Sequence, residues 1–465
     1  MGSEMCIRDR KYIDKLQQEV VDKNRCFGCG LCTAPFNSKK AFMKKTNDVP
    51  IPVFNLLEKE DIDPKYYRAC PGLEIDYYEL YQKFYKSIPS DWYSGIVRKS
   101  AIGYSLNQTI RKNSSSGGII SEVLIYLLEN KLIDAAILVK QGTIDSPKDA
   151  KYFFARNKRD ILECSQSIYT PVSTLDSLKE FIPNENYAIT CLPEQSAAIR
   201  YLQINNDKIA NQIKYVLGPY TGTSLNNLAI DALLRMSKIK STDLIKQIKW
   251  RAGEWPGKLK IKMNSGKVIE SEKIYYNFLI PFYISNQSMQ SYDFVNEFAD
   301  LSVGDAWSPK YESKKQGFSV VVSRNDEMNK ILDDMKKNKI IELSNVEKKE
   351  ILNMHGHMID FKKRGSYIRK KFKNLLGQEA ASNGLRPDKI SFLRYCVEFL
   401  IIFIFKISSL SISRRLLEMI PIPLLGPFFN RLRLLWKDVS KPIKRNKLSK
   451  LNMVQTGRLN SDEKN

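Results

Sequence analysis

The pattern of hydrophobic and polar positions predicts alternating helices and strands from about residue 97 onward. Apolar residues recur at helical spacing over residues 118–130, 173–181 and 193–202. Short apolar runs of strand length occupy residues 134–140 and 187–191. Because strands that alternate with helices usually build a sheet covered by helices, this stretch predicts a mixed α/β core.

Shorter apolar runs follow between residues 218 and 346. Residues 259–263 and 267–270 flank the sequence Asn264-Ser265-Gly266, which predicts a β-hairpin. Residues 318–323 form another run of strand length. This second stretch therefore predicts an α/β or β-rich continuation of the core.

A third apolar region lies near the end of the chain, at residues 392–412. Its wholly apolar part, residues 399–405, lies between Glu398 and Lys406. Both charges would lie inside the bilayer if this segment spanned a membrane, at a cost of several kcal/mol. The polar residues of the region share one helical face, which predicts an amphipathic helix. The last 25 residues are predicted to be disordered.

The distribution of charge supports this interpretation of the tail. The chain has 465 residues and a net charge of +23. Residues 360–465 hold 23 Lys and Arg against 8 Asp and Glu, which is +15 of that total. Basic side chains beside Leu, Phe and Trp suit an anionic membrane surface, whereas the mildly basic remainder argues against a nucleic-acid partner. A membrane-spanning helix and a helix packed on protein are the alternatives.

Four cysteines carry the clearest chemical signal. Cys26, Cys29 and Cys32 have the spacing C-x2-C-x2-C, and Cys70 follows at a distance. Three closely spaced thiolates can bind one side of an iron–sulfur cube, and a remote cysteine can complete it. Phe36 stands where two-cluster ferredoxins carry a further cysteine, so the spacing predicts one 4Fe-4S cluster. A zinc site or buried thiols without metal are the alternatives.

A second candidate site is the loop Ser114-Ser115-Ser116-Gly117-Gly118, directly before the helix predicted from residue 119. The first turn of a helix has unpaired N–H groups that attract phosphate, and glycines let the backbone approach it. The loop therefore predicts a site for a flavin phosphate. A helix start capped by serine after a flexible loop explains the same residues.

Seven stretches of the chain share their order with a known family. They are CFGCGLC, ACPG, SSSGGIISEVLIYLLENKLIDAAILV, SIYTPVSTLDSLK, LPEQSAAIRYL, WRAGEWPG and FVNEFADLSVGDAW. Together they resemble the coenzyme F(420) hydrogenase/dehydrogenase beta-subunit family, a group of flavin- and iron–sulfur-containing oxidoreductase subunits. The chain looks most similar to bacterial members associated with surface-polysaccharide synthesis. Asp305 lies in the last stretch, where it could bind a flavin or orient a substrate; a turn residue is the alternative.

The resemblance implies a redox function. Electrons would pass from a ferredoxin-like donor through the cluster and a flavin, FAD rather than FMN, to a small-molecule substrate. No apolar signal segment follows the first ten residues, so we expect a cytoplasmic protein, peripheral on the inner face of the cell membrane. The alternative is a non-catalytic, membrane-associated assembly or scaffold protein that retains a structural iron–sulfur cluster.

Some positions depart from the family pattern. Glu194, Thr221, Ser288 and Ser291 stand where family members often carry cysteines. These departures imply that no second cluster is present, and they favour the scaffold alternative.

The predicted fold is α/β or α+β, with a small ferredoxin-like segment, a mixed α/β core and a basic amphipathic helical tail. Six segments follow from the patterns and the resemblance. They are an N-terminal extension (1–22) whose first residues could be a sequencing scar, the 4Fe-4S segment (23–75), an aromatic helical connector (76–96), an N-terminal α/β domain with the flavin loop (97–217), a C-terminal family domain (218–346) and the basic tail (347–465).

Overall fold

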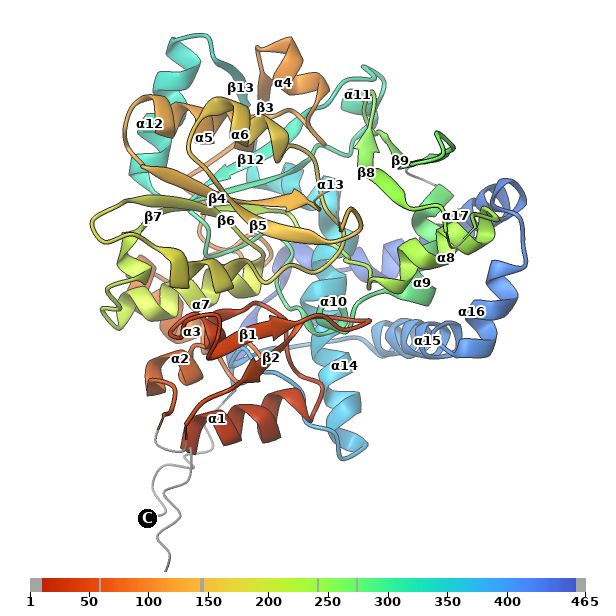
Figure 1. Ribbon diagram of the computed structural model, residues 1–465, viewed down its shortest axis with the longest axis horizontal. Helices are drawn as coiled ribbons and strands as arrows, with labels where there is room; N and C mark the ends of the chain where they lie inside the picture. Colours follow the sequence, from red (N-terminus) through yellow and green to blue (C-terminus); the bar gives the residue numbers. More distant parts are fainter. Residues whose placement is uncertain (1–10, 58–59, 143–145, 241, 273–274, 457–465) are drawn as a thin grey trace, which may run out of the picture.

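The computed structural model describes residues 11–456, apart from residues 58–59, 143–145, 241 and 273–274. The candidate scar at residues 1–10 lies outside the described residues. Eight strands form the central sheet, namely β3 (Lys99–Ser105), β4 (Ala135–Gln141), β5 (Ala150–Ala155), β6 (Tyr187–Thr190), β7 (Ile213–Pro219), β11 (Leu301–Asp305), β12 (Ser319–Ser323) and β13 (Ile341–Asn345). Their order is β13-β3-β12-β11-β7-β6-β4-β5 (Figure 1). The predicted segments 97–217 and 218–346 both contribute strands to this one sheet.

The central sheet contains both parallel and antiparallel strand pairs. Strands β11, β7, β6 and β4 are parallel neighbours, and the remaining pairs are antiparallel. The inner strand β12 is buried along its whole length, since both faces of the sheet are covered. Its Val-rich sequence fits such a position.

Helices cover both faces of this sheet. On one face lie α5 (Ile119–Glu129), α6 (Lys158–Glu163) and α12 (Asp326–Lys337), and on the other lies α7 (Pro193–Ile204) (Figure 1). Helix α5 buries apolar residues three or four positions apart, as its periodicity predicted. The helix predicted at residues 173–181 is a 3-10 helix over Thr174–Glu180.

A separate three-stranded sheet follows β7. It consists of β8 (Ile245–Ala252), β9 (Lys258–Met263) and β10 (Val268–Glu272), all antiparallel. The predicted hairpin at residues 264–266 is therefore confirmed, with Gly266 at a φ of +89°. Helices α8 (Leu228–Met236) and α9 (Leu279–Tyr283) share a hydrophobic core with this sheet.

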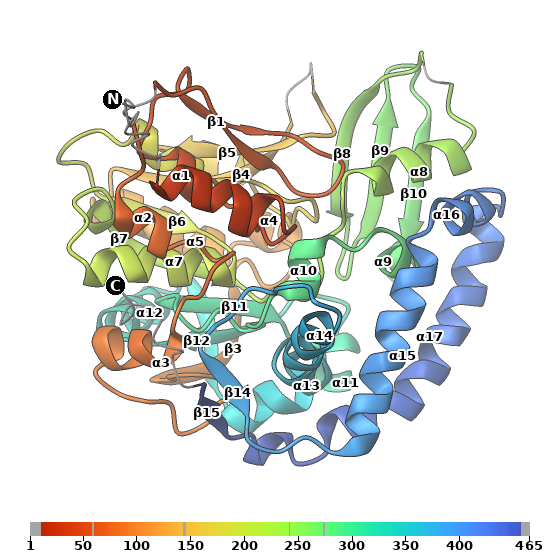
Figure 2. The ribbon, with the colours of Figure 1, turned by 90° about the horizontal axis from the view of Figure 1, so that it is seen from below.

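The cysteine segment packs beside α7. It begins with α1 (Lys11–Leu16) and contains a short hairpin of β1 (Ala41–Lys44) and β2 (Ile51–Phe54) and the helix α2 (Pro64–Arg68) (Figure 2). The aromatic connector is helical, as predicted, over α3 (Tyr77–Leu80) and a turn at Tyr81–Tyr85.

The C-terminal region is helical, as predicted, but the prediction that its last 25 residues are disordered is wrong up to residue 456. Strand β15 (Met453–Gln455) pairs with β14 (Leu385–Pro387), and Leu448 is fully buried in the main core. The helices are α13 (Lys348–Lys362), α14 (Arg364–Leu375), α15 (Phe392–Ser408), α16 (Ser411–Glu418) and α17 (Ile422–Arg445) (Figure 2). Apolar residues that lie among the basic ones, such as Leu448 and Met453, attach the end of the chain to the main hydrophobic core.

Helix α15 buries its charges and exposes much of its apolar surface. Arg394 and Glu398 are both fully buried, and they pair at 2.8 Å. Arg394 also lies 2.6 Å from Asp360 of α13, and Arg369 of α14 pairs with Glu398. The two charges that break up the apolar region therefore face the protein.

No single helix within the described ranges is long and apolar enough to cross a membrane. Helices α15 and α16 pass that test only as a pair, and they are bent by 73° at their junction. Residues 392–439 nevertheless hold 18 of the 27 exposed large apolar side chains in the described part of the chain. The tail therefore presents an apolar outer surface, which we call the C-terminal apolar face.

We expect Arg394→Met to lower the free energy of unfolding by roughly 3 kcal/mol, because two buried carboxylates lose a partner. Chemical denaturation of the intact chain would measure the change. Arg415→Met removes an exposed arginine from α16 and should change it by less than about 0.5 kcal/mol. Equal effects of the two substitutions would contradict a structural role for the buried network.

Candidate functional site

The four predicted cluster ligands lie around one buried cavity. Cys26, Cys29 and Cys32 come from the loop and short 3-10 turn that precede β1, and Cys70 follows α2. All four line a cavity of about 20 Å³, and none of them forms a disulfide. The structure thus brings together two parts of the chain that are about 40 residues apart.

Close packing against a second segment shapes the cysteine loop. Gly30 adopts a φ of +86°, which favours glycine. A Cβ at Gly30 would lie 2.6 Å from the backbone nitrogen of Asp176. The N–H of Leu175 donates to the carbonyl of Cys29 at 2.9 Å, so the two segments are held together by their backbones.

The electrostatics of the cavity suit a bound cation. Burial, followed by neighbouring thiols, raises the pKa of Cys29, of Cys32 and of Cys70, in the last case to about 12. Burial also raises the pKa of Cys26, although the N–H of Gly28 donates to its sulfur at 3.3 Å and opposes that shift. Thiolates gathered in one buried place are stabilised by bound metal, so this donor set fits an iron–sulfur cluster.

The hydroxyl groups of the predicted flavin loop bind protein groups. Ser114 and Ser116 each donate to a backbone carbonyl, at 2.7 and 2.8 Å. The N–H of Gly117 donates to the hydroxyl of Ser319 at 2.9 Å, and a Cβ at Gly117 would lie 2.5 Å from the carbonyl oxygen of Gly103. Packing against the sheet therefore explains this glycine, and the phosphate site at the loop stays a prediction.

Arg251, at the end of β8, joins three of the sequence motifs. Its Nη2 donates to the carbonyl of Ser115 at 2.7 Å and lies 3.0 Å from Oδ2 of Asp305. Its Nη1 donates to the hydroxyl of Tyr169 at 3.3 Å. The buried guanidinium thus gathers the flavin loop, Asp305 and the SIYT motif at one point, which we call the arginine junction.

Aromatic rings lie close to the arginine junction. The rings of Trp255 and Trp307 have centroids 4.7 Å apart. Nε2 of His355 donates to the carbonyl of Asp305 at 2.8 Å. Burial lowers the pKa of His355 to about 4, so its ring is neutral near pH 7.

The sequence did not reveal the role of Arg251. The motif WRAGEWPG contains this arginine, but its partners are 54 to 136 residues away along the chain.

One short segment contacts both the cysteine loop and the arginine junction. The N–H of Ser167 donates to the hydroxyl of Ser115 at 2.6 Å, and the hydroxyl of Ser173 donates to the carbonyl of Gly28 at 2.8 Å. Tyr169 contacts Arg251, and Ser173 contacts the cysteine loop. These two residues are four positions apart, so at most about 14 Å of extended chain separates them. The two candidate sites are therefore neighbours.

Three of the positions that depart from the family pattern meet around a buried lysine. Nζ of Lys362 donates to the carbonyl of Ser288 at 2.8 Å. The side chain of Glu194 interacts electrostatically with Lys362 and hydrogen-bonds to Ser291. Burial raises the pKa of Glu194 and lowers that of Lys362. Buried polar and titratable groups, rather than cysteines, thus fill this region, and the sequence alone did not predict that they meet.

Comparisons with known proteins identify the class to which this fold belongs, which is a class of oxidoreductase subunits. The family model described as "Coenzyme F(420) hydrogenase/dehydrogenase, beta subunit N-term" matches residues 101–179, and its C-terminal counterpart matches residues 184–349. Together they cover more than half of the chain. The protein therefore belongs to the coenzyme F(420) hydrogenase/dehydrogenase beta-subunit family. The four candidate cluster cysteines precede both matched ranges.

Three curated relatives come from Methanocaldococcus jannaschii. A coenzyme F(420)-dependent sulfite reductase is 26% identical, over 71% of this chain and 49% of that protein. An uncharacterized protein is 25% identical, over 69% of this chain and 89% of its own length. An F(420)-dependent formate dehydrogenase subunit beta is 22% identical, over 30% of this chain and 36% of that protein. The chain thus spans half or less of the two relatives with a named activity.

A solved structure gives a weaker match. It is that of the F(420)-reducing nickel–iron hydrogenase complex from Methanosarcina barkeri, with a TM-score of 0.49 and 20% identity. The match covers 62% of this chain and 96% of that chain.

The packing of Gly30 can be tested against a glycine of nearly the same conformation. Gly30→Ala should destabilise the protein by roughly 2 kcal/mol more than Gly266→Ala, because only the first adds a clash to the backbone strain. Both positions have a φ near +90°, but a Cβ at Gly266 meets nothing within 4 Å. Thermal unfolding would compare the variants, and equal midpoints would show that the cysteine loop is loosely held.

Proposed function

We propose that this protein is an iron–sulfur flavoprotein subunit that transfers electrons between a ferredoxin-like partner and a two-electron acceptor. The observation that carries the proposal is the convergence of Cys26, Cys29, Cys32 and Cys70 on one buried cavity. A bound 4Fe-4S cluster would supply one-electron chemistry there.

The spacing of the cysteines favours a cluster over zinc. Structural zinc sites usually take two separated C-x2-C pairs, whereas Cys26, Cys29 and Cys32 fall within seven residues. A 4Fe-4S cube binds each thiolate at a different corner, so three closely spaced cysteines and one remote cysteine can hold it.

We place the flavin at the arginine junction, with FAD as the favoured form. The contacts of Arg251 bring the flavin loop, Asp305 and Tyr169 together, and the segment from residue 167 to 173 connects them with the cysteine loop. Asp305 would then orient the flavin or the substrate. The names of two relatives suggest the deazaflavin F(420) as the two-electron partner of those proteins, and we propose it as a candidate here.

The role in surface-polysaccharide synthesis stays a prediction from the resemblance. The non-catalytic scaffold remains the second candidate, because Glu194, Ser288 and Ser291 surround the buried Lys362 where family members often carry cysteines. The two candidates differ in whether the purified protein holds flavin.

The cluster proposal predicts that Cys70→Ser, purified without oxygen, loses most of its iron and acid-labile sulfide. Cys164→Ser is the matched control, because that cysteine is half-buried outside the cavity. Iron and sulfide analysis and electron paramagnetic resonance after dithionite reduction would measure the loss. A wild-type protein that holds one zinc and no iron would overturn the proposal.

The flavin proposal predicts absorbance near 450 nm, bleached by dithionite, in the same wild-type preparation. Arg251→Met should reduce the flavin content, whereas iron content should stay unchanged because the cysteines are untouched. Iron without flavin in the wild type would favour the scaffold.

We also propose that the C-terminal apolar face binds an anionic membrane surface. The exposed side chains there include Phe403, Leu424 and Phe428, and the exposed Lys406 and Arg431 lie on the same helices. An apolar surface flanked by cations is attracted to anionic headgroups and can bury its apolar side chains at the interface.

Flotation with vesicles of phosphatidylglycerol and phosphatidylcholine would test membrane binding. The wild type should float with these vesicles, and less with pure phosphatidylcholine. Phe403→Asp combined with Phe428→Asp should abolish flotation. Leu57→Asp, at an exposed site more than 300 residues before the C-terminal apolar face, should not. Unchanged flotation of the double variant would refute binding through this face.

A further inference from the structure

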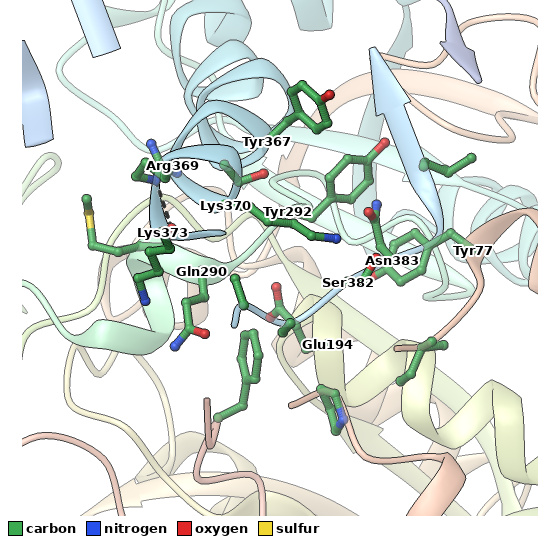
Figure 3. Close-up of a pocket in the computed structure, with 18 of the residues that line it drawn as sticks. Tyr77, Glu194, Gln290, Tyr292, Tyr367, Arg369, Lys370, Lys373, Ser382 and Asn383 are labelled. Atoms are coloured by element: carbon green, nitrogen blue, oxygen red, sulfur yellow. Dashed lines mark hydrogen bonds between the residues drawn. The ribbon is translucent and has the colours of Figure 1, made fainter. Parts of the chain in front are cut away.

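A second, larger cavity adjoins the cysteine cavity. It has a volume of about 150 Å³ and lies among α14, the start of α7 and the loop that leads to β14 (Figure 3). Phe27 and Pro71, the residues next to Cys26 and Cys70, line both cavities. Twelve of the twenty lining residues lie beyond residue 349, where the match to the family models ends. The cavity is therefore largely built by the C-terminal region of this chain.

Two lysines give the cavity an excess of positive charge. Lys370 and Lys373 both line the cavity from α14, and Lys370 points toward Tyr292 whereas Lys373 points toward Gln290 (Figure 3). Neither forms a salt bridge within the described part of the chain, although Glu74 interacts electrostatically with Lys370. Burial lowers the pKa of both lysines, so a bound anion would offset an existing electrostatic cost.

The other charges in the cavity wall are compensated. Arg369 pairs with Glu398, and Glu194 interacts electrostatically with the buried Lys362. Oε1 of Glu194, a residue only 6% exposed, has no hydrogen-bond partner among the described residues. A carboxyl oxygen left in this state in a cavity wall suits a ligand that carries a hydrogen-bonding group.

The remaining walls are mostly apolar. They include Phe27, Ile75, Tyr77, Leu385 and Ile402. Cavities of about 150 Å³ with such walls can hold a molecule of the size of benzene. The lining thus combines apolar walls for a small hydrophobic body with two cations for a negative group.

We propose that this cavity binds a small organic anion, namely a carboxylate or phosphate carried by an apolar body about the size of a benzene ring. Lys370 binds the anionic group, Lys373 adds positive charge to the cavity wall, the apolar walls enclose the body, and Glu194 hydrogen-bonds to its polar substituent. The wall between this ligand and the cysteine cavity is one residue thick, since Phe27 and Pro71 line both cavities. The proposed binding site depends only on the cavity, whereas a role of the ligand as reactant or effector would rest on the proposed redox function.

Isothermal titration calorimetry under argon, with 4-hydroxybenzoate as probe, would test the site on the full-length protein as purified. The wild type should bind 4-hydroxybenzoate, and bind neutral 4-hydroxybenzyl alcohol at least tenfold more weakly. Lys370→Met combined with Lys373→Met should weaken 4-hydroxybenzoate binding by at least tenfold. Lys371→Met, which removes an exposed lysine from the same helix, should leave binding unchanged.

Two further measurements keep the test decisive. Ala381→Phe, which fills the cavity from a lining position, should abolish binding of every probe, and thermal unfolding would verify that each variant is folded. Phenyl phosphate and inorganic phosphate would separate recognition of an anionic aromatic ligand from recognition of phosphate alone. Equal binding of acid and alcohol, equal binding by the Lys370/Lys373 variant, or no binding by the wild type would overturn the proposal. Iron analysis of the same sample reports separately on the cluster proposal.

Discussion

Buried charged residues between positions 360 and 369 pair with oppositely charged groups on other elements, and these pairs hold the C-terminal helices on the α/β core. Asp360, Lys362, Lys363 and Arg369 are each at most 5% exposed. Their partners lie on other elements: Arg394 and Glu398 on α15, Glu194 on α7, and Glu297 in the loop before β11. Because an unpaired buried charge costs several kcal/mol, these helices cannot shift without exposing or separating several ion pairs at once. The position of α14 is therefore fixed by electrostatics as well as by packing.

This constraint explains two features of the surface and interior. With Arg394 and Glu398 turned inward, α15 presents phenylalanine and isoleucine side chains outward, which gives the C-terminal apolar face. With Arg369 committed to Glu398, the neighbouring Lys370 and Lys373 are left to line the cavity beside the cysteines. Helix α14 thus binds α15 through Arg369 and forms part of the cavity wall through Lys370 and Lys373.

Local patterns predicted the parts of this protein that depend on nearby residues. The spacing of Cys26, Cys29 and Cys32, the helix at residues 118–130 and the hairpin around Gly266 are all set within a few positions of chain. The arginine junction and the Lys362–Glu194 pair were not predictable, since each joins residues that are at least 50 positions apart and gives no periodic signal. The disorder prediction failed for residues 441–456 because composition does not show that Leu448 and β15 find a partner surface in β14 and the core.

The long separation between the cysteine loop and α14 has a consequence for biosynthesis. Cys26 leaves the ribosome about 340 residues before Lys370. At about 5–20 residues per second, the wall that covers Phe27 and Pro71 arrives tens of seconds after the cysteine loop. The thiols of a nascent chain are therefore open during that interval both to oxidants and to delivery of iron. The proposed cluster would therefore be easiest to insert before α14 has been synthesised.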